Sequence, residues 1–212
     1  MTLVHETSNE LSRTPTTLTA AEYLVLERAA ETKNEYIHGE MHPMTGASRK
    51  HNLIATNILA SLHFQLRRQP CEVYPSDMRV KVEVTELITY PDISIICGEP
   101  CFDDSHKDTL LNPTVLVEVL SPPTAAYDRG DKFENYRQLP SLQEYLLVAQ
   151  DKMHVEQYCR QPAHTWLFTE FKRASEYFAL HSIHCELTLA DIYEKVTFDQ
   201  PRLLNGQAHQ EA

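Results

Sequence analysis

The sequence contains little glycine, a single tryptophan and no long apolar run. Its five glycines form neither a GxGxxG pattern nor a P-loop, so a nucleotide-binding interpretation has no motif to support it. A GxSxG turn is also absent, which leaves a serine-hydrolase interpretation without support. Because no stretch of about 18 consecutive apolar residues occurs, we expect no membrane span.

Cysteine is scarce and irregularly spaced. The five cysteines form no CxxC pair, which predicts reduced thiols that behave as small apolar groups. They are Cys71, Cys97, Cys101, Cys159 and Cys185. Residues 1–17 are polar and lack the basic and apolar regions of a secretory signal, so we expect a cytoplasmic protein. We also expect residues 1–17 to form a flexible arm and residues 199–212 a flexible tail.

Basic residues are in the minority, with 19 Lys and Arg against 30 Asp and Glu and a formal net charge of -11. This balance disfavours partners that are recognised through bulk positive charge, such as an anionic membrane or duplex DNA. Residues 47–75 differ, because they hold four basic residues (Arg49, Lys50, Arg67 and Arg68) and one acidic residue. Any nucleic acid is therefore expected to bind weakly, through a narrow and strongly salt-sensitive strip.

Hydrophobic patterning predicts one mixed α/β domain over residues 18–198. Capping signals at Thr19 and Ser48 mark the start of two helices. The expected helices cover about 20–30, 49–68, 129–138 and 189–194. The expected strands are two short pieces within 35–41 around a His38-Gly39 turn, then 78–84, 93–97, 115–120, 144–148 and 154–158, with one or two more after 166.

Glu118 is the most unusual residue in this pattern. It lies inside the continuous apolar run 115–120, which is typical of a central strand covered on both faces. A buried carboxylate is costly unless it is paired or bound to a cation. Exposure at a strand end and a salt bridge to a covering helix are the structural alternatives.

A second carboxylate, Asp92, stands at the start of the preceding apolar run, in Tyr90-Pro91-Asp92. An ordinary turn would also explain an aspartate after proline. If the runs 93–97 and 115–120 are neighbouring strands, however, Asp92 and Glu118 converge on one point. Two carboxylates with several waters and phosphate oxygens are a typical Mg²⁺ environment.

Lys132 is the candidate cation beside these carboxylates. The loop after residue 120 leads directly into its helix, and Tyr136 shares its helix face at the i,i+4 spacing. Lys132 is thus able to point back toward Glu118, although an exposed helix lysine is the simpler alternative.

Taken together, these motifs resemble the Uma2 family, a family assigned to endonucleases of the PD-(D/E)xK superfamily and formerly called a domain of unknown function. The resemblance covers roughly residues 18–198. It rests on Tyr90-Pro91-Asp92, Leu116–Pro122, Asp128–Lys132, Tyr136 and Leu142–Val148, with further likeness at Glu35–Glu40, His51 and Leu187–Tyr193.

The resemblance implies a restriction-endonuclease-like core, in which a mixed central β-sheet is flanked by α-helices. Asp92 matches the PD aspartate and Glu118 the acidic residue of (D/E)xK. Leu120 stands where the motif lysine is usual, and Lys132 matches the shifted lysine of the family. The resemblance implies that the catalytic residues are Asp92, Glu118 and Lys132, with Glu40, His51 and Tyr136 as secondary candidates. The expected ligands of Mg²⁺ or Mn²⁺ are Asp92, Glu118 and the Val119 carbonyl. The expected DNA contacts are Arg49, Lys50 and Arg129.

The expected activity is metal-dependent phosphodiester hydrolysis in DNA, with a homodimer expected by analogy with duplex cutters. The competing interpretation is a catalytically silent module that retains the nuclease fold. A zinc site at His181, His184 and Cys185 is disfavoured, because strand alternation puts His184 on a different face and no fourth ligand is evident.

Overall fold

The computed structural model describes residues 17–198, so the predicted arm (except Thr17) and the predicted tail lie outside the described residues. The helices are α1 Ala20–Ala29, α2 Arg49–Leu66, α3 Ala125–Arg129, α4 Asp131–Tyr136 and α5 Leu189–Ile192, with 3-10 turns at Pro162–His164 and His181–Ile183. The strands are β1 Asn34–Ile37, β2 Glu40–Pro43, β3 Cys71–Pro75, β4 Arg79–Val82, β5 Leu87–Thr89, β6 Ile93–Cys97, β7 Thr109–Leu110, β8 Val115–Leu120, β9 Glu144–Ala149, β10 Val155–Arg160, β11 Trp166–Phe171, β12 Tyr177–Leu180 and β13 Cys185–Thr188. None of the helices in the described part of the chain has both the length and the apolar character needed to cross a bilayer.

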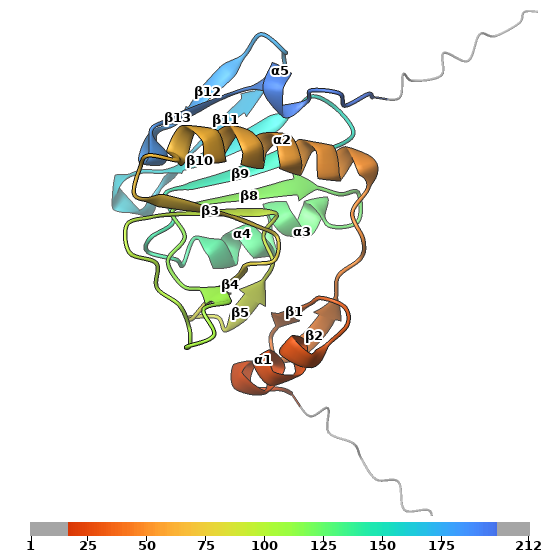
Figure 1. The fold of residues 1–212 in the computed structure, drawn as a ribbon, viewed down its shortest axis with the longest axis vertical. Helices are drawn as coiled ribbons and strands as arrows, with labels where there is room; N and C mark the ends of the chain where they lie inside the picture. The colour runs from red at the N-terminus through yellow and green to blue at the C-terminus, as the bar shows by residue number, and fades with distance from the viewer. Residues whose placement is uncertain (1–16, 199–212) are drawn as a thin grey trace, which may run out of the picture.

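The centre of the molecule is a six-stranded sheet in the order β11-β10-β9-β8-β6-β3. β8 and β9 pair in parallel, whereas β6 runs antiparallel to β8. A five-stranded sheet (β2-β1-β5-β4-β7) and the hairpin β12-β13 complete the strand set described. In Figure 1, α2 runs along one side of the six-stranded sheet, and α3 and α4 lie between that sheet and β4 and β5. The predicted mixed sheet flanked by helices is confirmed.

Strand alternation in β8 divides the core into two layers. Val115, Val117 and Val119 pack with the apolar stripe of α2. Leu116 and Leu120 face the opposite way, toward α4 and the smaller sheet. Because the side-chain period of a strand is two residues, Glu118 points into this second layer.

The capping box of Thr19 and Glu22 and the Ser48 cap of α2 confirm the predicted helix starts. The helix predicted over 129–138 is instead two short helices, because Gly130 (φ −101°, ψ −104°) leaves helical geometry between α3 and α4. The strand predicted over 78–84 is shorter, because a turn begins at Glu83 and leaves Val84 exposed. The segment after residue 166 forms three strands, one more than the upper prediction.

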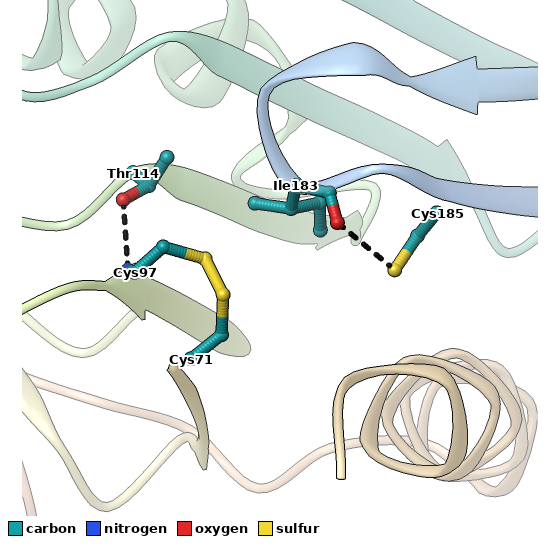
Figure 2. Close-up of a disulfide and its surroundings, with 5 residues drawn as sticks. All are labelled: Cys71, Cys97, Thr114, Ile183 and Cys185. Atoms are coloured by element: carbon teal, nitrogen blue, oxygen red, sulfur yellow. Dashed lines mark hydrogen bonds between the residues drawn. A yellow bond between two sulfur atoms is a disulfide. The ribbon is translucent and has the colours of Figure 1, made fainter. Parts of the chain in front are cut away.

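The prediction of uniformly reduced cysteines is wrong for one pair. Cys71 and Cys97 form a disulfide between β3 and β6, which Figure 2 shows beside the Cys97–Thr114 hydrogen bond. The antiparallel register sets these two residues opposite each other, with their Cα atoms 4.0 Å apart. Cys101, Cys159 and Cys185 are free. The spacing of the cysteines along the chain does not reveal the register of β3 against β6, so the sequence could not predict this disulfide.

Candidate active site

Asp92 and Glu118 meet at one end of the six-stranded sheet. The register of β6 against β8 pairs Ile93 with Val117, which places Asp92 beside Glu118. The Asp92 main-chain N–H donates to Glu118 Oε2 at 3.4 Å, and the Val119 N–H donates to Asp92 Oδ2 at 2.7 Å. Each carboxylate thus accepts a hydrogen bond from the main chain next to the other one. This is the convergence that we expected if the runs 93–97 and 115–120 are neighbouring strands.

Glu118 is buried, with 5% of the residue exposed. Its Oε1 accepts a hydrogen bond from the Tyr136 hydroxyl at 3.0 Å and lies 2.9 Å from Lys132 Nζ. The Tyr136 hydroxyl also lies 2.7 Å from Thr89 Oγ1. Tyr136 is therefore held from two sides, and it fixes the orientation of the Glu118 carboxylate.

Lys132 is the centre of positive charge in this region. Besides Glu118, its Nζ lies 3.2 Å from Glu35 Oε1 and 3.6 Å from Asp128 Oδ1. After the break at Gly130, α4 begins at Asp131, one residue before Lys132, and the Lys132 side chain is buried. We call Glu35, Asp92, Glu118, Asp128 and Lys132 the carboxylate–lysine cluster.

His51 approaches the cluster from the first turns of α2. Its Nε2 lies 3.1 Å from Asp92 Oδ2, while its buried Nδ1 has no hydrogen-bond partner among the described residues. The start of α2 is held in place because the Ser48 hydroxyl bonds Gln150, which in turn donates to the Leu120 carbonyl at 2.9 Å. The end of β8 and the start of α2 are thereby connected next to Asp92.

The cluster holds more negative than positive charge, and this changes its titration. Burial, together with the nearby Asp128 and Asp92 carboxylates, raises the pKa of Glu118 to about 8, although Lys132 opposes the change. Burial also raises the pKa of Asp128. For Lys132, burial lowers the pKa, but Glu118 and its other anionic neighbours outweigh burial and hold the pKa well above its ordinary value. Lys132 therefore stays a cation that contacts three carboxylates, in a cluster that holds four carboxylates and one ammonium group.

The structure does not bring Glu40 to the cluster. Glu40 opens β2 after the His38-Gly39 turn, and its side chain is 67% exposed and lies 3.7 Å from His42. The strand–turn–strand pattern around His38-Gly39 is equally consistent with an exposed hairpin residue at this position. Glu35, on the preceding strand β1, contacts Lys132 instead, and its Oε1 accepts a hydrogen bond from the Tyr90 N–H at 3.3 Å.

The three expected DNA-contact residues lie around the cluster rather than in it. Arg49 is exposed in the first turn of α2, next to Lys50. Arg129 is bound to Glu156 through Nε at 3.0 Å and Nη2 at 2.6 Å. It lines a shallow hollow of about 170 Å³ just beyond the end of β8.

Two cluster members were missed from the sequence, Glu35 and Asp128. Asp128 carried a usable signal, because it stands four residues before Lys132 on the α3–α4 segment and pairs with it. Glu35 lies within the Glu35–Glu40 motif, but its contact with Lys132 depends on the pairing of β1 with β5 at Tyr36 and Ile88. No local pattern reports that pairing.

The donor set fits a hard divalent cation. Within residues 17–198, no group of three or more His, Cys, Asp or Glu side chains is arranged to hold a metal ion. The set proposed from the sequence has two carboxylates and one carbonyl, which suits a metal that keeps several waters. Glu118 Oε2 takes only the 3.4 Å bond from Asp92, and Asp92 Oδ1 takes no hydrogen bond among the described residues. One oxygen of each carboxylate thus remains for a cation, with Lys132 and His51 beside them.

Comparison with known proteins shows the family and the fold of this chain. Two uncharacterized proteins of Synechocystis sp. are similar: sll1609 is 41% identical over 72% of this chain and 86% of its own length, and slr1290 is 33% identical over 85% and 94%. The crystal structure of a "putative nuclease belonging to DUF820" from Anabaena variabilis shares the fold, with a TM-score of 0.70 and 19% identity over 85% of this chain and 99% of that one. Residues 20–191 match the family Uma2, described as "Putative restriction endonuclease". The chain belongs to the Uma2 family, and its core is restriction-endonuclease-like.

Proposed function

We propose that this protein is a metal-dependent endonuclease that hydrolyses phosphodiester bonds in DNA. The observation that carries the proposal is the contact of Glu118 with both Asp92 and Lys132, three residues that come from β8, the start of β6 and α4. Family membership supports the same reaction class. A homodimer would supply one such site for each strand of a duplex.

The proposed metal ligands are Asp92, Glu118 and the Val119 carbonyl. Bound Mg²⁺ or Mn²⁺ would lower the pKa of water and offset charge on the scissile phosphate. The chain's own residues prepare the site before any substrate arrives. Lys132 stays an ammonium group beside Glu118, where it is able to orient the attacking water and stabilise charge on the phosphoryl oxygens.

Tyr136 and His51 are proposed to position the carboxylates. The Tyr136 hydroxyl, held at Thr89, keeps Glu118 Oε1 turned toward Lys132 and leaves Oε2 on the side of Asp92. His51 contacts Asp92 Oδ2, the same oxygen that accepts from Val119, and so leaves Oδ1 for a ligand. Both residues act through a carboxylate rather than on substrate.

The direct test is cleavage of plasmid and single-stranded DNA with Mg²⁺ or Mn²⁺ by the wild type, Asp92→Ala, Glu118→Gln and Lys132→Ala. We expect each variant to lose cleavage and every reaction to stop with a chelator. Glu35→Gln and Glu40→Gln form a matched pair, in which only the first removes a charge from the cluster and should slow cleavage. Equal cleavage by all of these proteins would show that the site is misassigned. A wild type that binds DNA but never cuts it favours the silent module.

A further inference from the structure

The outer face of α2 is the least acidic part of an acidic protein. Residues 47–71 contain no Asp or Glu, although the chain carries a net charge of -11. Exposed positions recur every three or four residues and form a ridge along the helix. These are Arg49, Asn52, Thr56, Ala60, His63 and Arg67.

An exposed aromatic ring lies at the far end of this ridge. Phe64 is 62% exposed, and the Arg67 guanidinium carbon lies 4.2 Å from the ring centroid. A single exposed apolar side chain needs no explanation by itself. A phenylalanine ring joined to a guanidinium, however, offers a flat and positively charged surface of the kind on which unpaired bases stack.

The same helix carries His51, which contacts Asp92 at the other end. His51 and Phe64 are 13 residues apart, which corresponds to about 20 Å along an α-helix. Glu186 and Glu194 flank one side of the helix, where Gln65 and Asn57 bond their main-chain carbonyls. These contacts place two acidic residues beside the helix, whereas residues 47–71 carry none.

We propose that the α2 ridge binds an unpaired strand of DNA that leads away from the cluster, with one base stacked against the Phe64–Arg67 pair. The strand is unpaired because a base inside a duplex has no free face to offer the ring. This inference rests on the proposed function and adds the form of the substrate.

The test measures binding without cleavage. Anisotropy of a fluorescein-labelled 12-nucleotide oligothymidylate is followed in a chelator at low salt, with the Asp92→Ala protein as the parent. Adding Phe64→Ala should weaken binding about tenfold, the usual cost of one lost stack. Tyr177→Ala is the matched control, because Tyr177 on β12 is 64% exposed and should leave binding unchanged.

The charge is tested separately. Arg67→Gln should weaken binding and reduce the slope of log K against log salt by about 0.7, the value for one lost contact with a single strand. Arg173→Gln, at another exposed arginine, should leave the slope unchanged.

Equal effects of Phe64→Ala and Tyr177→Ala would overturn the proposal, as would equally tight, Phe64-sensitive binding of a blunt 12-base-pair duplex. Failure here is distinguishable from failure of the proposed function. If the protein never cuts DNA but Phe64→Ala weakens oligonucleotide binding, the proposed function fails and the ridge proposal stands. If the protein cuts DNA but its binding does not depend on Phe64, only the ridge proposal fails.

Discussion

Two clusters of charged side chains within residues 17–198 differ in their balance of charge, and one is buried whereas the other is only partly buried. In the arginine–aspartate cluster, Arg28 Nη2 lies 2.7 Å from Asp104 and 2.8 Å from Asp108, and Arg79 also contacts Asp108. Two guanidinium groups there face two carboxylates. In the carboxylate–lysine cluster, four carboxylates share one lysine, which contacts three of them.

The imbalance appears in the titration of each cluster. Hydrogen bonds from Arg28 are the main reason that the pKa of Asp108 is well below its ordinary value. Burial and neighbouring acids instead raise the pKa of Glu118. In the arginine–aspartate cluster the guanidinium groups balance the carboxylates, so the cluster stabilises the fold by itself. The carboxylate–lysine cluster has too few cations to balance its carboxylates. The comparison therefore supports the proposal that the carboxylate–lysine cluster, rather than the arginine–aspartate cluster, holds the divalent cation.

The largest effect is expected from Glu118→Gln. This change removes a proposed metal ligand, so metal-dependent DNA cleavage should fall at least about a thousandfold, a loss of about 4 kcal/mol in transition-state stabilisation. The same change relieves repulsion in the metal-free protein, whose melting temperature at pH 8 should rise. Cleavage assays and calorimetry on one preparation check both effects. A variant that loses activity by unfolding contradicts this interpretation.

The second effect concerns the balanced cluster. Asp108→Asn leaves Arg28 and Arg79 without a shared counter-charge, which should lower the free energy of unfolding by about 2 kcal/mol. The value stays below that of a fully buried pair because the Asp108 side chain is 33% exposed. Urea denaturation at pH 7 measures the change. No loss of stability would mean that the cluster is not structural.

The third effect, the smallest when it is counted per pH unit, is on the pH dependence of stability, where the two clusters should have opposite signs. Glu118 binds its proton more tightly when folded, so between its ordinary pKa of 4.5 and about 8 the metal-free protein should lose stability as pH rises, by at most about 1.4 kcal/mol per pH unit. Asp108 contributes stability above its ordinary pKa of 3.8, and this is lost as pH falls further. Denaturant titrations from pH 3 to 8 separate the two. A slope between pH 5 and 8 that survives in Glu118→Gln argues against this assignment.

The sequence predicted the central strands well because their signal is local. β6 and β8 are continuous apolar runs with the observed bounds, and a charge inside one of them was enough to single out Glu118. Lys132 was placed correctly although its helix was not, because the i,i+4 face it shares with Tyr136 survives the break at Gly130.

What the sequence could not predict depends on pairing between distant segments. Glu35 reaches Lys132 only because β1 pairs with β5, and Cys71 meets Cys97 only through the register of β3 and β6. Glu40 was expected as a secondary site residue from its resemblance to the family, whereas the structure places Glu35 of the same motif at Lys132. Local patterns report burial and helix starts, whereas non-local register decides which charges meet.

Calorimetric titration of the metal-free protein with Mn²⁺ tests the proposed metal site most directly. We expect one site in the wild type and in Glu40→Gln, whose carboxylate lies outside the cluster. We expect binding to disappear in Asp92→Ala and Glu118→Gln. No binding in the wild type, or binding that persists in both cluster variants, would contradict the claim that the unbalanced cluster is a metal site.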